Sequence, residues 1–298
     1  MLSYMRQRTL ALLSRFSISE NTFMITLALL IGVLAGVCNF LFRRAIEFFH
    51  WLVMEQGLLL FDISFEHWSM SRFFVVLFPV TGALLLLPFG IFFAKDMKFG
   101  FASFLAQVNL HGAKIPGRTI ITRGLASAIT LGTGGSAGQE GPIAQIGGAV
   151  GSKFGQGFKV SGNRLKVLVA CGVAGGVAAT FNAPIAGVFF AHEIVLLASF
   201  ELSSFTSIVI ASGMSTVVSR ALLGNEVVFS VPPYQAGSLW QLLVYALLGV
   251  VIGVLASAFI RMHMQIKIWF DKIRLPRLAK PIAGGFFVGC IGIGLPQV

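Results

Sequence analysis

The hydrophobic and charged positions divide the chain into long apolar runs separated by short basic stretches. Residues 21–42 and 73–94 carry no charged side chain. An α-helix needs about 20 residues to cross the hydrocarbon core of a bilayer, and both runs reach that length. The sequence therefore predicts two membrane-spanning helices, the first ending at Arg43 and Arg44 and the second at Lys95.

The middle of the chain is apolar but interrupted. Glu140 is the only charged residue between positions 124 and 150, and the glycines and Pro142 break that segment repeatedly. Residues 167–192 have no charged side chain but contain Asn182 and Pro184 near their centre. Irregular backbone is tolerated at membrane depth only where protein covers it or where it lines a cavity. We therefore expect helices that stop partway through the bilayer, as at many permeation sites.

The remaining segments complete a multi-span pattern. Residues 202–219 and 239–260 are predicted helices, residues 231–234 a loop, and the basic stretch 261–280 a cytosolic segment before the last apolar run at 281–298. We expect about eight to ten embedded helices, several shorter than a full span. Because the last run has no polar tail, we also expect the chain to be incomplete at its C-terminus.

Composition supports an integral membrane protein. Hydrophobic residues make up 56% of the chain and charged residues 11%, where a soluble domain has about 25% charged residues; the mean hydropathy is +0.87. The net charge of +11 comes from short basic clusters between apolar runs, which favours loops near anionic lipid over nucleic-acid binding. The three cysteines lie in apolar runs without metal-ligand spacing and are interpreted as core residues. They are Cys38, Cys171 and Cys290.

The first 20 residues predict the orientation of the chain. They carry Arg6, Arg8 and Arg15 and contain no cleavable signal pattern. Basic residues before a first span favour the cytosolic side. We therefore expect a cytosolic segment at residues 1–20, a membrane domain at residues 21–298, and insertion in the plasma (inner) membrane.

Glu140 is the most informative residue. A carboxylate inside a membrane segment costs about 2.5–3.5 kcal/mol and is a functional candidate by default. Pro142 suits the first turn of a helix, so Glu140 is predicted just before a helix N-terminus, where free amides and the helix dipole favour an anion. The carboxylate could occupy that position until a small anion replaces it, which predicts a gate; a plain helix cap is the alternative.

Two stretches of the sequence resemble a known family. Residues 134–142 read GGSAGQEGP, residues 145–148 read QIGG, and residues 181–190 read FNAPIAGVFF. They are similar to the Gly-(Lys/Arg)-Glu-Gly-Pro motif and the next signature of the CLC chloride channel and transporter family. The resemblance covers residues 21–298.

The resemblance implies an all-α membrane protein with broken, re-entrant helices, built as an inverted repeat of which this chain holds the first half and the start of the second. It implies a homodimer with one pathway per subunit for chloride or a similar small anion. The sequence has no Gly-Lys-Ser/Thr phosphate-binding loop, and Leu196 stands where a zinc-helix motif starting at His192 needs a second His, so we expect no cofactor or metal. Glu140 is the implied gate. The implied anion pathway contains Gly138, Gln139, Gly141, Pro142 and Ile143.

Three positions depart from the family pattern. Gln139 stands where Lys or Arg is usual. A serine-containing turn of the family aligns with Phe99 and Gly100, so only backbone amides could bind an anion there. The inner glutamate of proton-coupled members aligns with Ile194, and Glu193 lies one residue earlier, about 100° away on an α-helix. The apolar Ile194 favours a channel, and proton-coupled exchange is the alternative.

Two other classes compete with this interpretation. Residues 134–138 fit Gly-x-Ser-x-Gly, so Ser136 with His192 as base could form an intramembrane serine hydrolase; that pattern requires a strand before the turn. A cation-driven transporter of another fold also uses broken helices, but it normally needs more acidic residues in the membrane than this chain has.

Overall fold

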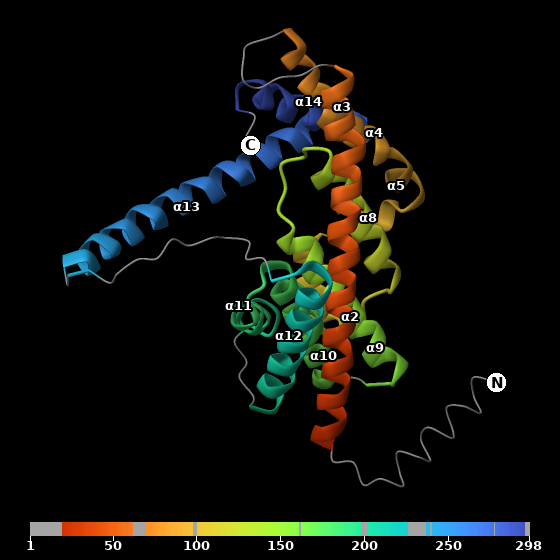
Figure 1. The fold of residues 1–298 in the computed structure, drawn as a ribbon, viewed down its shortest axis with the longest axis vertical. Helices are drawn as coiled ribbons and strands as arrows, with labels where there is room; N and C mark the ends of the chain where they lie inside the picture. The colour runs from red at the N-terminus through yellow and green to blue at the C-terminus, as the bar shows by residue number, and fades with distance from the viewer. Residues whose placement is uncertain are drawn as a thin grey trace. The chain divides into compact units, whose positions relative to one another are not determined.

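The computed structural model describes residues 20–61, 70–97, 100–160, 162–197, 202–225, 237–238, 240–276 and 278–295. Regular structure in these residues is helical (Figure 1). The predicted segment 1–20, except Glu20, and the predicted loop 231–234 lie outside the described residues. The elements before the non-helical residues 133–139 are α2 (Glu20–Phe49), the π-helical η1 (His50–Glu55), α3 (Gln56–Leu60), the 3₁₀ helix η2 (Met70–Val76), α4 (Leu77–Leu85), α5 (Leu87–Phe92), α6 (Ala94–Met97), α7 (Phe101–Leu110) and α8 (Arg118–Gly132).

The elements that follow residues 133–139 include the most buried of the described helices. They are α9 (Glu140–Gly157), α10 (Asn163–Phe181), α11 (Pro184–Phe190), the π-helical η3 (Ala191–Val195), α12 (Leu202–Leu223), α13 (Trp240–Lys272) and α14 (Ala279–Gly294). The chain separates into two compact units, residues 1–228 with 281–298, and residues 229–280. The second unit contains α13, none of whose residues is buried. The site described below lies in the first unit.

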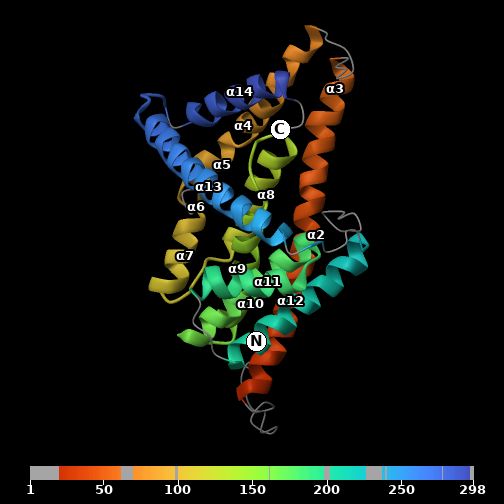
Figure 2. The same cartoon turned by 90° about the vertical axis from the view of Figure 1, so that its left-hand side faces the viewer.

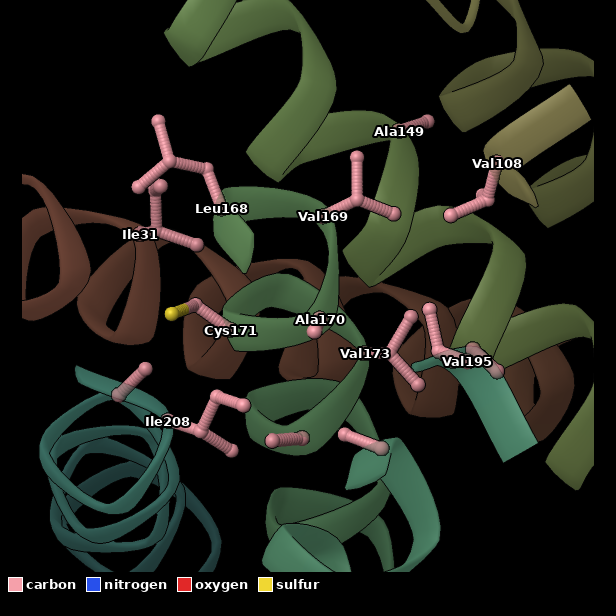
Figure 3. Close-up of a cluster of buried hydrophobic side chains, with 14 of the residues drawn as sticks. Ile31, Val108, Ala149, Leu168, Val169, Ala170, Cys171, Val173, Val195 and Ile208 are labelled. Atoms are coloured by element: carbon pink, nitrogen blue, oxygen red, sulfur yellow. The ribbon is translucent and has the colours of Figure 1, made fainter. Parts of the chain in front are cut away.

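Helix α10 forms the centre of the first unit. Small and apolar residues surround its whole circumference, as expected for a helix covered on all sides. Helices α2, α9, α11 and α12 pack around it (Figures 1 and 2). Figure 3 shows Ile31 of α2, Ile208 of α12, Ala149 of α9 and Val195 of η3 converging on Cys171 and its neighbours in α10.

Glycines allow α9 and α10 to approach closely. A Cβ on Gly147 would overlap the carbonyl of Gly172, and a Cβ on Gly172 would overlap the carbonyl of Gly147. One turn further along, Gly151 makes the same kind of contact with Leu168. Backbone-to-backbone packing through small residues is typical of helices in lipid. The two helices therefore hold each other in a fixed position.

The structure confirms that the predicted spans are long apolar helices, but some of these helices end at other residues than predicted. Five helical stretches are long and apolar enough to cross a membrane, and three shorter apolar helices accompany them among the described residues. The first helix does not end at Arg43 and Arg44, because α2 continues to Phe49 and the helical stretch to Leu60. Similarly, α13 runs to Lys272 through the basic stretch predicted as a cytosolic connection. Exposed Arg and Lys have good helix propensity, so charge alone did not end either helix.

The cysteines differ in burial. Cys171 is buried at the centre of α10, and Cys38 is partly buried in α2, as predicted for core residues. Cys290, on α14, is exposed, so the prediction is wrong there. An apolar sequence context cannot distinguish a residue that faces protein from one that faces outward on a membrane helix.

Candidate functional site

The predicted interruption before Glu140 is present between α8 and α9. Helix α8 ends at Gly132, and residues 133–139 are not helical. Gly134 has φ +80°, a conformation that glycine adopts without strain, and the Gly135 N–H donates to the Thr130 carbonyl at 2.8 Å. These features close the end of α8 and turn the chain back towards α9.

Glu140 is itself the first residue of α9, rather than the residue before the helix. Pro142 is the third residue and has no N–H, and the Ile143 N–H donates to the Gln139 carbonyl at 3.0 Å. The amides of Glu140 and Gly141 are therefore the free donors of the first turn. The helix dipole adds partial positive charge at this end. The Ile143 amide, which was expected to face an anion, is used within the helix.

The Glu140 carboxylate is exposed and lies over the loop. Its Oε2 occupies the space where a Cβ on Gly138 would stand. Within the described part of the chain, its carboxylate has no hydrogen bond or ion pair. The N-cap residue of α9 is Gln139, and its side chain makes no capping bond. Glu140 therefore does not act as a helix cap in this conformation, and no bond within the described residues holds its side chain.

A pocket of about 310 Å³ adjoins this carboxylate. Its lining combines loop residues with two residues that the sequence did not indicate, Ile46 of α2 and Leu131 of α8. Ile46 lies far from the motif in sequence, so only tertiary packing could identify it: its carbonyl is 2.7 Å from where a Cβ on Gly132 would stand. The other lining residues are Ala137, Gly138, Gln139 and Glu140.

The second predicted part of the anion pathway is separate from this pocket. Phe99 lies outside the described residues, and Gly100 is the N-cap of α7. Helix α7 meets α9 where the Phe104 ring lies against Gly148. Gly148 is eight residues beyond Glu140, or about 12 Å along the helix axis. Gly100 does not line the pocket next to Glu140.

Glu193 and Ile194 lie in the π-helical turn η3. The Leu196 N–H donates to the Ala191 carbonyl, five residues back, at 3.1 Å. The rotation of 100° per residue, assumed for an α-helix, therefore does not apply to these two positions. Glu193 is exposed and Ile194 is partly buried. Single π-turns occur frequently at functional sites.

The serine-hydrolase pattern lacks its structural context. Ser136 follows helix α8, where the pattern requires a strand. His192 is largely buried in η3, and its ring packs edge-to-face on Phe205 at 6.5 Å. The structure thus supports a helix–loop–helix site with a carboxylate at a helix start, and not a nucleophile elbow.

These features define the class of the protein: a helical, multi-span membrane protein whose interrupted helices place a carboxylate at a helix N-terminus. A family model described as "Voltage gated chloride channel" matches residues 82–298. The chain therefore belongs to the voltage-gated chloride channel (CLC) family, as its sequence motifs predicted, and it has the membrane fold of that family.

Similar proteins include both named channels and named exchangers. The chain is 31% identical over 292 residues to "Chloride channel protein CLC-f" of Arabidopsis thaliana, covering 90% of this chain and 36% of that protein. It is 30% identical over 257 residues to "H(+)/Cl(-) exchange transporter ClcA" of Vibrio campbellii, covering 83% of this chain and 52% of the relative. The chain thus spans only part of the length of these relatives.

Two solved structures share the fold. A "slow cyanobacterial Cl-/H+ antiporter" matches with a TM-score of 0.75 and 25% identity, over 91% of this chain and 63% of the other. A "CLC-type fluoride/proton antiporter" has the same TM-score at 21% identity, over 93% of this chain and 66% of the other.

Proposed function

We propose that this chain forms an anion pathway for chloride or a similar small anion, and that Glu140 gates it. The supporting observation is the geometry of α9: its first residue is a carboxylate with no partner among the described residues, next to free amides and a pocket. An anion and this carboxylate would compete for the same positive helix end. Gly138, Gln139, Gly141 and Pro142 would line that end through their backbone.

We infer proton-coupled exchange as the mode of transport, in place of the channel favoured by Ile194 alone. A relative 30% identical to this chain is named as a proton/chloride exchange transporter, and a solved structure at 25% identity is titled a chloride/proton antiporter. The channel alternative is supported by the apolar Ile194, where proton-coupled members resemble one another in having a glutamate, and by the name of the 31% identical relative, "Chloride channel protein CLC-f".

The remaining parts of the proposal concern assembly and orientation. The family resemblance supports a homodimer in which each subunit carries its own pathway. The basic N-terminal segment 1–20 supports a cytosolic N-terminus and insertion in the plasma membrane, with residues 21–298 as one membrane domain.

The test is chloride efflux from liposomes that contain the purified chain, with a pH electrode recording proton movement. The variant Glu140→Gln keeps the shape of the side chain and removes its charge, so we expect altered efflux and loss of its pH dependence between about pH 4 and pH 8, a range that protonates an ordinary carboxyl group. The matched control is Glu47→Gln, which changes an exposed, ion-paired acid on α2.

Each outcome separates the alternatives. Efflux that depends on Glu140 with protons moving at a fixed ratio to chloride supports exchange, and the same efflux without proton movement supports the channel. Equal efflux from wild type and Glu140→Gln at every pH would contradict the gate. Absence of any efflux would contradict transport by this chain on its own.

A further inference from the structure

Three long helices of the first unit begin at the same end of that unit. Helices α2 and α12 run parallel, because Gly32 packs on Ala211 and Gly36 packs on Ser215. Helix α10 runs in the same direction, since its Gly175 lies against Ala35 of α2 and, further along, its Thr180 hydroxyl donates to Asn39 of α2. The N-termini of α2, α10 and α12 therefore face the same side (Figure 2). Each contributes free amides and partial positive charge there.

A pocket of about 440 Å³ lies between these three helix starts. Its volume is within the range of ligand sites. Polar side chains from all three helices line it, including Asn163 and Arg164 of α10 and Ser204 of α12. Apolar side chains lie about one turn further along α2 and α10, among them Met24 and Val167. On α2 and α10 the lining thus changes from polar to apolar along the helix axis, whereas the α12 residues that line the pocket are all polar (Ser204, Thr206 and Ser207).

Ser204 gives independent evidence for a ligand. Its side chain is 7% exposed and lines the pocket. Its hydroxyl makes no hydrogen bond to any described residue. The hydroxyl is not among the fully enclosed polar atoms of the described residues, so it is open to the pocket and available to hydrogen-bond a ligand there.

Arg164 supplies the charge. It forms an ion pair with Glu20, the first residue of α2, and both side chains are more than half exposed. Exposed pairs of this kind are weak and exchange easily. A guanidinium has five N–H donors, so Arg164 can bind a second oxyanion in addition to one carboxylate. Glu20 opposes an anion in the pocket, which gives the two members of the pair opposite effects on binding.

We propose that this pocket binds a phosphate group, carried by a membrane phospholipid. Arg164, the Ser204 hydroxyl and the helix starts would hold the phosphate, and the apolar part of the lining would contact the glycerol and the first methylenes of the acyl chains. The change from polar to apolar lining on α2 and α10 favours a lipid over free phosphate. This proposal does not depend on the transport function.

The test measures the thermal unfolding midpoint Tm of the purified chain in detergent during titration with dioctanoyl phosphatidic acid, with dioctanoylglycerol, which lacks the phosphate, and with inorganic phosphate. Ligands that bind only the folded state raise Tm with concentration. We expect phosphatidic acid to raise Tm at concentrations where dioctanoylglycerol has no effect. Arg164→Gln and Ser204→Ala should weaken that effect, Arg164→Gln by on the order of tenfold in apparent affinity.

Glu20→Gln separates binding from simple stability. If Arg164 binds the phosphate, Glu20→Gln strengthens binding while Arg164→Gln weakens it. Equal weakening by both variants would mean that only the ion pair matters and would overturn the proposal. The matched control is Arg44→Gln, an arginine of similar exposure paired with Glu47 in α2, which should leave lipid binding unchanged.

The ligand arms identify the source of the phosphate. An effect of phosphatidic acid alone supports the lipid. An equal effect of inorganic phosphate supports the phosphate site but contradicts the lipid source. An equal effect of dioctanoylglycerol would overturn the proposal, because the pocket would then be an apolar groove. If Arg164→Gln fails to fold, Ser204→Ala and Glu20→Gln still decide.

Discussion

Gly172 has no side chain, and this allows α9, which begins at Glu140, to lie directly against α10. The carbonyl of Gly147 occupies the space that a Cβ would need. We expect Gly172→Ala to force α9 and α10 apart and to destabilise the fold by about 1–3 kcal/mol, the usual effect of overpacking. Thermal unfolding of the purified chain in detergent measures this effect.

Gly213→Ala is the control for that substitution. Gly213 lies in α12 with nothing within 4 Å of its potential Cβ, and alanine has the better helix propensity. The control should therefore be neutral or slightly stabilising. Similar losses of stability in both variants would contradict the close contact between α9 and α10.

Glu193 tests the proton side of the proposed exchange. It is exposed in the π-turn and is an acidic residue within an apolar segment, as Glu140 is. We expect Glu193→Gln to reduce proton movement more than chloride movement in the liposome assay. Ile194→Ala, which removes apolar volume but no charge, should leave the ratio of protons to chloride unchanged. An unchanged ratio in Glu193→Gln would exclude this carboxylate from the proton path.

At the scale of elements, the break between α10 and α11 is fixed by α12. Asn182 has φ +53°, and its side-chain oxygen accepts a hydrogen bond from Arg220 Nε at 2.6 Å. The Asn182 amide donates to Asn225 at 3.2 Å, and the Ser212 hydroxyl donates to the Pro184 carbonyl at 2.6 Å. Side chains of α12 and of Asn225, just after its end, thus hold the start of α11 in place.

The bond between Arg220 and Asn182 should have a measurable stability. We expect Arg220→Ala and Asn182→Ala each to lower the free energy of unfolding by about 1 kcal/mol, because the pair is charge-assisted but solvent-exposed. The double variant should lose less than the sum, since both substitutions remove the same bond. Additive losses in denaturant unfolding would show that the two side chains act independently.

The interruptions could be predicted from sequence, whereas the helix ends and the pocket walls could not. Gly and Pro act locally, so the breaks before Glu140 and at Asn182 followed from the residues themselves. The part of α2 beyond Arg44 packs against Gly132, 88 positions away in sequence (132 − 44), a contact that no local pattern predicts. Ile46 enters the site through that same contact. No pattern in the sequence predicted the π-turn at Glu193.

At the scale of the whole molecule, parallel packing strengthens the predicted orientation. Because α2 and α10 run in the same direction, the basic residues around the start of α10 lie at the same end of the first unit as Glu20. The other end of α2 carries Arg43 and Arg44 with Glu47. The end that begins at Glu20 is therefore the more basic one and is predicted to face the cytosol. Its basic residues are Lys153, Lys159, Arg164 and Lys166.

This orientation predicts a labelling pattern. After Cys38, Cys171 and Cys290 are replaced by alanine, we expect Glu47→Cys to react with a membrane-impermeant maleimide added to intact cells. Glu20→Cys should react only after permeabilisation. The reverse pattern would place the N-terminus outside. A cysteine-free chain measures the background.

The two backbone contacts between α9 and α10 also have a mechanical consequence. At the contacts of Gly147 with Gly172 and of Gly151 with Leu168, no side chain lies between the two main chains that could change rotamer and absorb a displacement. We expect α9 and α10 to move as one rigid pair. At the Glu140 end of this pair, only the loop 133–139 and the Glu140 side chain are then left to change conformation. The proposed gate at Glu140 would open by a short movement of a few side-chain atoms, so its speed would depend little on the viscosity or thickness of the surrounding bilayer.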